Sequence, residues 1–481
     1  MNSMATVLAF DFGASSGRAI RAVYDGKCLT YDEIHRFENI PIEEDGHLRW
    51  DVETILEEIH IAIEKAGTFD SLGFDTWGVD FGLIDAEGKL LEKPVHYRDA
   101  RTEGMLKQAV TLMPEEELYT HTGNQIMAIN TLFQLLALRE QNPDVLKKAA
   151  KILFMPDLFS SLLGADSVCE RSIASTSQML NPSTGQWSRE VFHTYGLQMK
   201  FGQIVDSGTI IGTLANGSKI IAVAGHDTQC ASAAMPCAEE SSENSAFLSC
   251  GTWSLLGTEL DAPILTETSC RSGLSNEIGA NGRINYLKNI IGLWLIQESR
   301  REYKRHGQAY SFAELEQQAL LSEPLRSFID PDAPEFVAPG DLPSRIQEFC
   351  WRTNQPVPET VGAVMRCIYE SLALKYRYAI EQLSAETGRT FTVLHVLGGG
   401  TKDRLLCQMT ADCCCLTVKA GPVEATALGN IIIQLKALGA LDSIEQGRRL
   451  IAETETIKTY TPNTQNNAEW NAAYERFKKL L

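Results

Sequence analysis

The chain has 481 residues, which is too long for one core, so two or three domains are expected. Its 44% of hydrophobic and 22% of charged residues are typical of a soluble globular protein. Its formal net charge of -19 excludes sequence-independent binding to nucleic acid, which needs a basic surface, but allows a small phosphorylated ligand held by local groups. No apolar run reaches the roughly 18 residues of a membrane span and the N-terminus lacks a signal peptide, so we expect a cytoplasmic protein without nucleic-acid or membrane partners.

The first part of the chain predicts three strands, a helix and a further strand. Residues 6–12 and 17–37 read as strands with a turn at Asp25-Gly26, which is typical of a β-meander. Residues 51–67 carry isoleucines at helical spacing and end in glycine, which predicts a helix, and residues 70–88 return to a strand. This order indicates the start of an actin-like, ribonuclease-H-like domain.

The turn after the first strand is a candidate phosphate site. Gly13 allows a ligand to approach the backbone closely, Ser15 and Ser16 supply hydroxyls, and Arg18 supplies a charged donor. Asp11, which ends the strand, is a candidate for holding a hydrated Mg²⁺. The alternative is a plain hairpin with glycine at its turn.

Two further stretches place polar residues at strand ends. Residues 74–81, FDTWGVDF, set Asp75 and Asp80 around Trp77-Gly78, which suits the face of a sugar; the alternative is a turn with a core tryptophan.

In residues 223–233, VAGHDTQCASA, an apolar strand ends where a helix starts, and such strand ends line the clefts of α/β proteins. Asp227 there is a candidate general base, because its carboxylate could accept a proton from a hydroxyl nucleophile. Phosphoryl transfer needs little beyond such a base, positioning and Mg²⁺. The alternative, which is compatible with that role, is that Asp227 caps the next helix.

The second half of the chain repeats this logic. Residues 244–260 again predict a strand, a glycine turn and a strand, so that Gly251-Thr252 would be a second phosphate turn or another plain hairpin. Similar halves predict two α/β domains, residues 1–240 and 241–481, with an interdomain cleft. The polar and acidic stretch 236–243 is the expected boundary.

The remaining elements predict a nucleotide pocket. Residues 286–297, YLKNIIGLWLIQ, predict a helix that opens with Asn289 and carries Gln297 on about the same face. A long helix stopped by Gly388 precedes a buried strand that ends in Gly398–Gly400, where a flat ring could lie against the backbone. The alternative is a tight turn from strand to helix. The predicted elements that follow are a helix at 402–413, a strand at 416–421 and a helix at 423–439.

The twelve cysteines stand in a chain without a secretion signal, so reduced thiols are expected. Cys413, Cys414 and Cys415 are adjacent and cannot all point at one metal ion, which favours small buried residues over a metal site.

Together the motifs resemble one family. The stretches DFGASSGR, DTWGVDF, YRDARTEGM, GHDT, SCGTWSLLG, LKNIIGLWLIQ, LGGGTKD and GPVEATALGN are similar, in order and across nearly the whole chain, to the FGGY carbohydrate kinases. The resemblance implies two actin-like ATPase domains that close over a cleft, with ATP and Mg²⁺ as cofactors. DFGASSGR, DTWGVDF and LKNIIGLW are similar to the branch that phosphorylates the 1-hydroxyl of L-rhamnulose in L-rhamnose breakdown.

The resemblance also implies roles for individual residues. Asp227 would be the proton acceptor, and Asp11 would face Mg²⁺ through water, as in actin-like ATPases generally. The ATP contacts would be Ala14, Ser15, Ser16, Gly17, Arg18, Thr252, Gln297 and Gly399. The sugar contacts would be Gly78, His226, Asp227, Thr228 and Asn289.

Some details of the resemblance leave alternatives open. Cys350 and Cys367 match positions paired in a relative, but both are expected to be free thiols here. A monomer or weak homodimer is expected. The alternatives are a sister kinase for another ketose such as L-fuculose or xylulose, a non-catalytic sugar or nucleotide sensor, and an actin-like ATPase without a small substrate.

Overall fold

The computed structural model describes residues 4–236 and 243–481. It divides into two compact units, each assembled from separate segments of the chain. Residues 237–242, most of the expected boundary, lie outside the described residues. Unit 1 comprises Met1–Ala238, Glu259–Tyr286 and Ala425–Thr454, and unit 2 comprises Glu239–Thr258, Leu287–Glu424 and Glu455–Leu481.

The main sheet of unit 1 has the strand order β13-β14-β6-β1-β2-β3. Strand β1 pairs antiparallel with β2 and parallel with β6, and β6 pairs parallel with β14. The predicted meander, the helix α1 and the return strand are thereby confirmed, in the order of a ribonuclease-H-like domain. The elements are β1 (Ala5–Phe12), β2 (Ser16–Tyr24), β3 (Leu29–Glu38), β6 (Ser71–Thr76), β13 (Thr209–Thr213), β14 (Lys219–Ala222) and α1 (Val52–Ala66).

Other strands and helices complete unit 1. The strands are β4 (Ile42–Glu44), β5 (His47–Arg49), β7 (Phe81–Ile84), β8 (Lys151–Phe154), β9 (Cys169–Glu170), β10 (Leu180–Asn181), β11 (Gln186–Trp187), β12 (Ile204–Val205) and β17 (Ser275–Ile278). The helices are α2 (Met105–Leu112), α3 (Glu115–Thr122), α4 (Thr131–Gln141), α5 (Pro143–Lys148), α6 (Met155–Leu162), α7 (Arg171–Ala174), α8 (Arg189–Thr194), α9 (Asp227–Ala233), α10 (Glu267–Arg271), α16 (Ala425–Ala437) and α17 (Ile444–Thr454).

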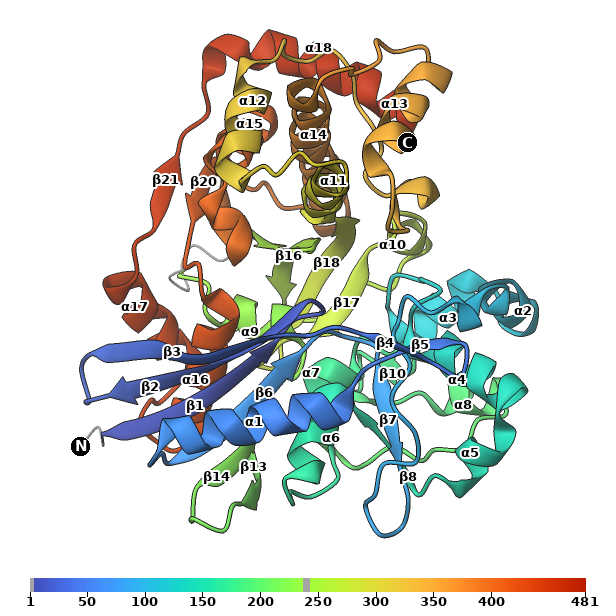
Figure 1. The fold of residues 1–481 in the computed structure, drawn as a ribbon, viewed down its shortest axis with the longest axis vertical. Helices are drawn as coiled ribbons and strands as arrows, with labels where there is room; N and C mark the ends of the chain where they lie inside the picture. The colour runs from blue at the N-terminus through green and yellow to red at the C-terminus, as the bar shows by residue number, and fades with distance from the viewer. Residues whose placement is uncertain (1–3, 237–242) are drawn as a thin grey trace. The chain divides into compact units, whose positions relative to one another are not determined.

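The two faces of the unit 1 sheet differ because side chains alternate along a strand. Phe10, Phe12 and Phe74 belong to an apolar core with residues of α1 and α6, and α1 lies in front of the sheet in Figure 1. Asp11 and Asp75 alternate with these residues and therefore point to the opposite face. On that face, Asn430 of α16 donates to Asp75, so α16 covers the side of the sheet that carries the carboxylates.

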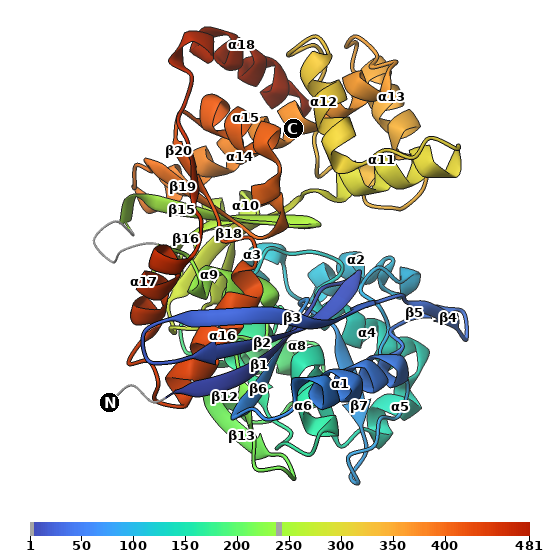
Figure 2. The same cartoon turned by 60° about the vertical axis from the view of Figure 1, so that its left-hand side comes forward.

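The sheet that contains β15 has the order β17-β18-β16-β15-β19-β20-β21. Strand β15 pairs antiparallel with β16 and parallel with β19, and β19 pairs parallel with β20, which repeats the arrangement around β1. Figure 2 shows β15, β19 and β20 together, with α14 and α15 beside them. The strands are β15 (Ser245–Cys250), β16 (Trp253–Leu260), β18 (Ile284–Ile291), β19 (Val393–Leu397), β20 (Thr417–Ala420) and β21 (Lys458–Tyr460).

The helices of unit 2 follow the predicted pattern after residue 360. Helix α14 is capped by Thr360, whose side chain accepts from the Ala363 amide, and it ends at Gly388 with a φ of 67°. The left-handed backbone there explains why glycine stops this helix. The helices are α11 (Trp294–Arg305), α12 (Phe312–Leu321), α13 (Leu342–Arg352), α14 (Val361–Thr387), α15 (Arg404–Cys414) and α18 (Asn467–Phe477).

The prediction of a helix opening with Asn289 is wrong. Asn289 lies in β18, and the helix α11 begins five residues later at Trp294. The run INYLKNII is almost entirely buried although it contains Asn285, Lys288 and Asn289, and such a short buried run is compatible with either element. Gly292 lies between β18 and α11. Packing requires glycine there, because a Cβ would lie 2.4 Å from the Ser254 hydroxyl.

Within residues 4–236 and 243–481, no helix combines the length and apolar character needed to cross a membrane.

Candidate active site

The first candidate phosphate turn is a tight hairpin between β1 and β2. The Gly13 amide donates to the Ser16 carbonyl at 2.9 Å, and the Asn39 side chain donates to the Gly13 carbonyl at 3.0 Å. Ser15 is exposed at the tip, with Ala14 and Ser16 partly exposed beside it. The turn is therefore a hairpin that also presents hydroxyl and backbone groups to solvent.

Two residues of this hairpin have structural partners of their own. A Cβ on Gly17 would lie 2.2 Å from the Phe37 ring, so packing alone requires glycine there. Arg18 lies opposite Asp11 across the β1–β2 pair and donates to one of its carboxylate oxygens at 2.6 and 2.9 Å. This ion pair holds both side chains at the end of β1 and partly neutralises the Asp11 charge.

Three carboxylates influence one another where β1, β6 and α9 meet. Asp11 and Asp75 are register partners in adjacent parallel strands. Asp75 is fully buried, and this burial, with the negative charges of Asp11 and Asp227, raises its pKa well above the usual range. One Asp75 oxygen accepts from Asn430 at 2.7 Å, and the other, Oδ1, is buried without a hydrogen-bond partner.

Asp227 is the first residue of α9, and its N-cap is His226. The Asp227 carboxylate accepts from the Thr228 amide at 2.5 Å. The Asp227 side chain is 35% exposed. Burial of the remainder and the Asp11 charge raise its pKa, while His226 opposes that rise. Asp227 is therefore not the N-cap residue, although its carboxylate accepts from the first-turn amide of Thr228, and it remains partly exposed where α9 begins.

His226 is held between two acids. Its Nδ1 lies 3.0 Å from Glu277, and its Nε2 lies 3.4 Å from Asp227. Burial opposes a charge on the ring, but Glu277 and Asp227 more than offset it, so the pKa of His226 is raised. A Cβ on Gly78 would lie 3.4 Å from the same Nε2, which places Gly78 against the imidazole. Gly78, His226, Asp227 and Thr228, four of the five predicted sugar contacts, are thus brought together in unit 1.

The motif around Gly78 also contains core residues. Trp77 is buried, stacks against Trp50 at 4.0 Å between ring centroids, and donates to Asp80 at 3.0 Å. Asp80 accepts further from Trp50 and the Tyr97 amide, and burial raises its pKa to about 6. The core alternative is therefore confirmed for Trp77, and Asp80 is the polar centre that orders this turn.

In unit 2, the second candidate phosphate turn meets the start of α11. The Gly251 amide donates to the Trp253 carbonyl at 2.9 Å, and the Gly251 carbonyl accepts from Leu293 at 2.9 Å. The Thr252 hydroxyl donates to the Gln297 side chain at 3.4 Å. Two predicted ATP contacts, Thr252 and Gln297, are therefore neighbours.

The glycine run after β19 reaches the end of β15. Gly398 has a φ of 82°, which favours glycine, and a Cβ on Gly400 would lie 2.2 Å from the Cys250 sulfur. A Cβ on Gly399, in contrast, would meet nothing within 4 Å. Gly398 and Gly400 are therefore explained by the fold, whereas Gly399 faces open space.

Asn289 and the cysteines complete the predicted set. Asn289 is partly exposed in β18, at a position that belongs to unit 2. Cys350 and Cys367 are buried free thiols. Cys413, Cys414 and Cys415 are also free, and within the part of the chain that the structure describes no group of three or more His, Cys, Asp or Glu side chains is arranged to hold a metal ion.

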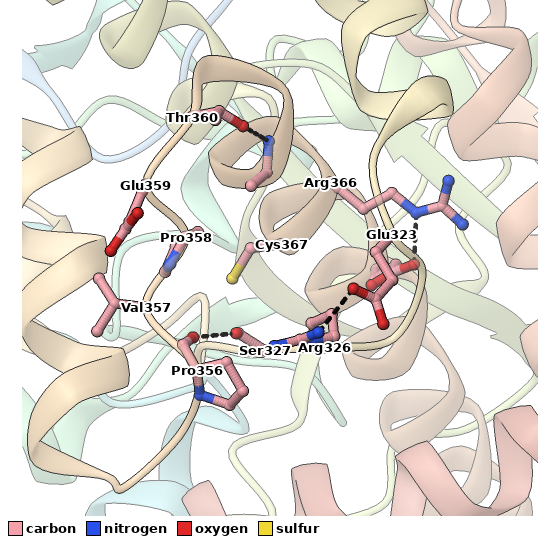
Figure 3. Close-up of a pocket in the computed structure, with 12 residues that line it drawn as sticks. Glu323, Arg326, Ser327, Pro356, Val357, Pro358, Glu359, Thr360, Arg366 and Cys367 are labelled. Atoms are coloured by element: carbon pink, nitrogen blue, oxygen red, sulfur yellow. Dashed lines mark hydrogen bonds and ion pairs between the residues drawn. The ribbon is translucent and has the colours of Figure 1, made fainter.

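A cavity of about 240 Å³ in unit 2 is lined by Cys367 but by none of the predicted ATP, sugar or Mg²⁺ contacts. Figure 3 shows it between the segment from Pro356 to Thr360 and the side chains of Arg326 and Arg366. Arg326 pairs with Glu323 at 2.6 Å, and Arg366 pairs with Glu370 at 2.6 Å. Each arginine already faces a carboxylate, and the further lining residue Glu359 leaves the cavity with one formal negative charge, so it does not favour an anionic ligand such as a phosphate.

Two residues that shape the site, Glu277 and Asn430, were not identified from the sequence, and a third, Asp75, was identified without its place beside Asp11. Glu277 holds His226, Asp75 lies beside Asp11, and Asn430 anchors Asp75. Glu277 and Asn430 lie 51 and 355 residues along the chain from their partners, and no local pattern connects them. Asp75 was visible in FDTWGVDF, but only the parallel register of β1 and β6 places it beside Asp11.

Comparison with known proteins covers almost the whole chain. The sequence models of the N-terminal and C-terminal domains of the FGGY family of carbohydrate kinases match residues 6–233 and 246–438. A rhamnulokinase of Bacteroides thetaiotaomicron is 42% identical, with 98% of this chain and 99% of the relative covered. A rhamnulokinase of Enterobacter sp. (strain 638) is 38% identical, with 98% and 97% covered.

Solved structures agree on the fold. A gluconate kinase from Lactobacillus acidophilus superposes with a TM-score of 0.79 at 15% identity, covering 99% of this chain and 98% of the other. A glycerol kinase from Plasmodium falciparum, solved with ADP, superposes with a TM-score of 0.76 at 15% identity, covering 100% and 98%. The two matched domains and the close sequence relatives lead to one conclusion: the chain belongs to the FGGY family of carbohydrate kinases.

Proposed function

We propose that this chain phosphorylates L-rhamnulose at its 1-hydroxyl with ATP, giving L-rhamnulose 1-phosphate and ADP in L-rhamnose breakdown. The observation that carries the proposal is the 42% identity, over 98% of this chain, to the rhamnulokinase of Bacteroides thetaiotaomicron. The geometry around Asp227 supports it, because a partly exposed carboxylate lies among the residues expected to contact the sugar.

Asp227 acts as the general base in this proposal. Its carboxylate takes the proton of the 1-hydroxyl as that oxygen attacks the γ-phosphorus, and the new O–P bond forms while the bond to ADP breaks. The hydrogen bond from the Thr228 backbone amide fixes one oxygen of the Asp227 carboxylate, so that the carboxylate is oriented before the sugar binds. His226, Thr228, Gly78 and Asn289 bind the sugar.

The proposal gives each unit its own set of nucleotide contacts. In unit 2, Thr252, Gln297 and Gly399 bind ATP, with the adenine against the backbone of Gly398–Gly400. In unit 1, the hairpin residues Ala14, Ser15, Ser16, Gly17 and Arg18 bind phosphate groups.

Asp11 is the proposed holder of a hydrated Mg²⁺. The fit rests on the donor set: Asp11 stands beside Asp75, whose Oδ1 is a buried oxygen without a partner. Mg²⁺ keeps several waters and takes one or two carboxylates together with phosphate oxygens, so no larger protein cluster is needed. When bound, the ion neutralises charge on the transferred phosphoryl group.

We place the enzyme in the cytoplasm as a monomer or weak homodimer. The free thiols of buried cysteines such as Cys350 and Cys367 suit a reducing compartment. Light scattering over a concentration series measures the oligomeric state.

The test is turnover on a panel of ketoses with ATP and Mg²⁺, for the wild type and Asp227→Asn. We expect L-rhamnulose to be the preferred substrate, and Asp227→Asn to reduce kcat by roughly 10²- to 10⁴-fold while sugar binding persists. Asp144→Asn is the matched control, because Asp144 is an exposed carboxylate on α5 of the same unit. Near-normal turnover of Asp227→Asn would remove Asp227 from its role, preference for L-fuculose or xylulose would reassign the substrate, and ATP hydrolysis independent of sugar would refute the kinase.

A further inference from the structure

We propose that Glu277 is a positioning residue that fixes the imidazole of His226 for sugar recognition beside Asp227. The inference deepens the proposed function and rests on it. It is carried by a chain of three side chains in unit 1, in which Glu277 contacts one ring nitrogen of His226 and Asp227 faces the other.

Glu277 is itself tightly held. Only 4% of its surface is exposed, in the short strand β17. The same oxygen that contacts His226 accepts from the Gln229 amide at 2.8 Å. The side-chain oxygen of Gln229, Oε1, accepts in turn from the side-chain amide of Asn285, which also donates to the Ser232 hydroxyl at 2.9 Å. These bonds fix the orientation of the Gln229 side-chain amide. Glu277 can therefore impose a direction on the ring.

The direction matters because the two ring nitrogens have different surroundings. With Nδ1–H donating to Glu277, Nε2 is the atom that faces Asp227 and Gly78, where the sugar is proposed to bind. Rotation of the ring by a half turn would place carbon atoms there instead. A carboxylate on Nδ1 is also a general means of fixing a histidine tautomer.

The charge on Glu277 has a second effect. Three acids face His226: Glu277, Asp227 and Glu170, which belong to three different elements of unit 1. Burial disfavours the charged ring, and these acids restore it, with Glu277 the strongest of them. A charged His226 presents Nε2–H as a donor to a sugar oxygen, and hydrogen bonds to charged groups are the stronger ones.

The decisive variant is Glu277→Gln, which keeps the size of the side chain and removes its charge. We expect the KM for L-rhamnulose to rise about 10- to 100-fold, the range for a hydrogen bond that involves a charged group, while kcat changes by less than about threefold. Nitrogen-15 NMR should show the pKa of His226 falling, with the signal assigned by its loss in His226→Gln. If substrate binding requires the charged ring, the alkaline limb of kcat/KM moves to lower pH in the variant.

A matched control and a double variant isolate the mechanism. Glu58→Gln removes a carboxylate that contacts a different histidine, His35, between α1 and β3, and should leave the KM unchanged. If Glu277 acts only through His226, adding Glu277→Gln to His226→Gln has no further effect on KM. If Glu277→Gln fails to fold, Glu277→Asp, which keeps the charge on a shorter arm, should give an intermediate KM.

The inference is overturned by a wild-type KM in Glu277→Gln, by an unchanged titration of His226, or by equal harm from Glu277→Gln with and without His226. A wild-type protein whose His226 carries no proton on Nδ1 would do the same. These failures differ from failure of the proposed function, which would appear as preference for another ketose or as ATP hydrolysis independent of sugar. Loss of thermal stability without a change in His226 titration would assign Glu277 a purely structural role and so contradict positioning.

Discussion

The contact between α16 and α9 leads to a sharp prediction about Gly429. A Cβ at this position would lie 1.8 Å from the carbonyl oxygen of Cys230 and 2.5 Å from its carbonyl carbon. Cβ contacts shorter than 3.0 Å essentially do not occur, and the obstacle is backbone. Gly429→Ala therefore has to move the two helices apart by at least 1.2 Å, the difference between 3.0 and 1.8 Å.

The displaced helix begins with Asp227, so the movement reaches the proposed base. A misplacement of about 1 Å costs roughly 10²-fold in rate, and we expect a loss of kcat of that order. Overpacking costs roughly 1–3 kcal/mol of unfolding free energy, of which alanine returns up to about 1 kcal/mol through its helix propensity. The loss of activity should thus exceed what the modest loss of stability would cause.

The assay couples ADP release to NADH oxidation at saturating L-rhamnulose and ATP, beside urea unfolding of the same sample. Gly362→Ala is the matched control, because its Cβ would lie 2.5 Å from the Gln318 carbonyl at the contact between α12 and α14. We expect that variant to lose stability and keep its kcat. A kcat for Gly429→Ala within threefold of the wild type would refute the reasoning that α16 sets the place of the base.

Two further predictions concern Gly399 and the buried pair of Arg448 with Glu259. In Gly399→Ala the added methyl group meets no protein atom within 4 Å, so the Tm should match that of the wild type. The KM for ATP should rise about tenfold, the effect of a misplaced methyl group. An unchanged KM for ATP would exclude a nucleotide contact. Arg448→Met removes the closest cation from the buried Glu259 carboxylate, which Arg448 contacts at 2.6 and 3.0 Å, and leaves Arg283 at 3.7 Å. The change should cost up to roughly 3–5 kcal/mol of unfolding free energy at pH 7 by urea titration, against almost none for the exposed Arg271→Met. Burial alone would raise the pKa of Glu259, but Arg448 lowers it, so this stabilisation is present above the ordinary glutamate pKa and disappears as the pH falls through the folded value; a difference between the two proteins that persisted in full at pH 3 would contradict it.

The local elements were predictable because short-range patterns determine them. The meander of β1–β3, the helix α14 and the strand β19 followed from periodicity and from glycine at the expected ends. The secondary structure around Asn289 was not predictable, because a short buried run fits a strand as well as a helix. Pairing with the neighbouring strands of the sheet determines which of the two forms.

The site was predictable only in part, for a similar physical reason. Asp227, His226 and Gly399 lie at strand ends and turns, where the sequence marks them. The roles of Glu277, Asn430 and Arg448 depend on contacts between segments far apart in the chain, and no window of sequence contains both partners. Side chains that position the reacting groups are therefore harder to find than the groups themselves.

Helix α16 belongs to unit 1 but follows most of unit 2 in the chain, which has a consequence for co-translational folding. Gln434 donates to the Leu8 carbonyl and Asn430 to Asp75, so one face of the first sheet stays uncovered until residues 425–454 emerge. The last strand of that sheet, β14, ends at Ala222, and synthesis of the roughly 200–230 residues from there to residues 425–454 takes on the order of 10–50 s at roughly 5–20 residues per second. During that time the nascent chain exposes a sheet face with partly apolar surroundings, and chaperone binding or premature termination within unit 2 would act on an N-terminal unit that still lacks its final helices.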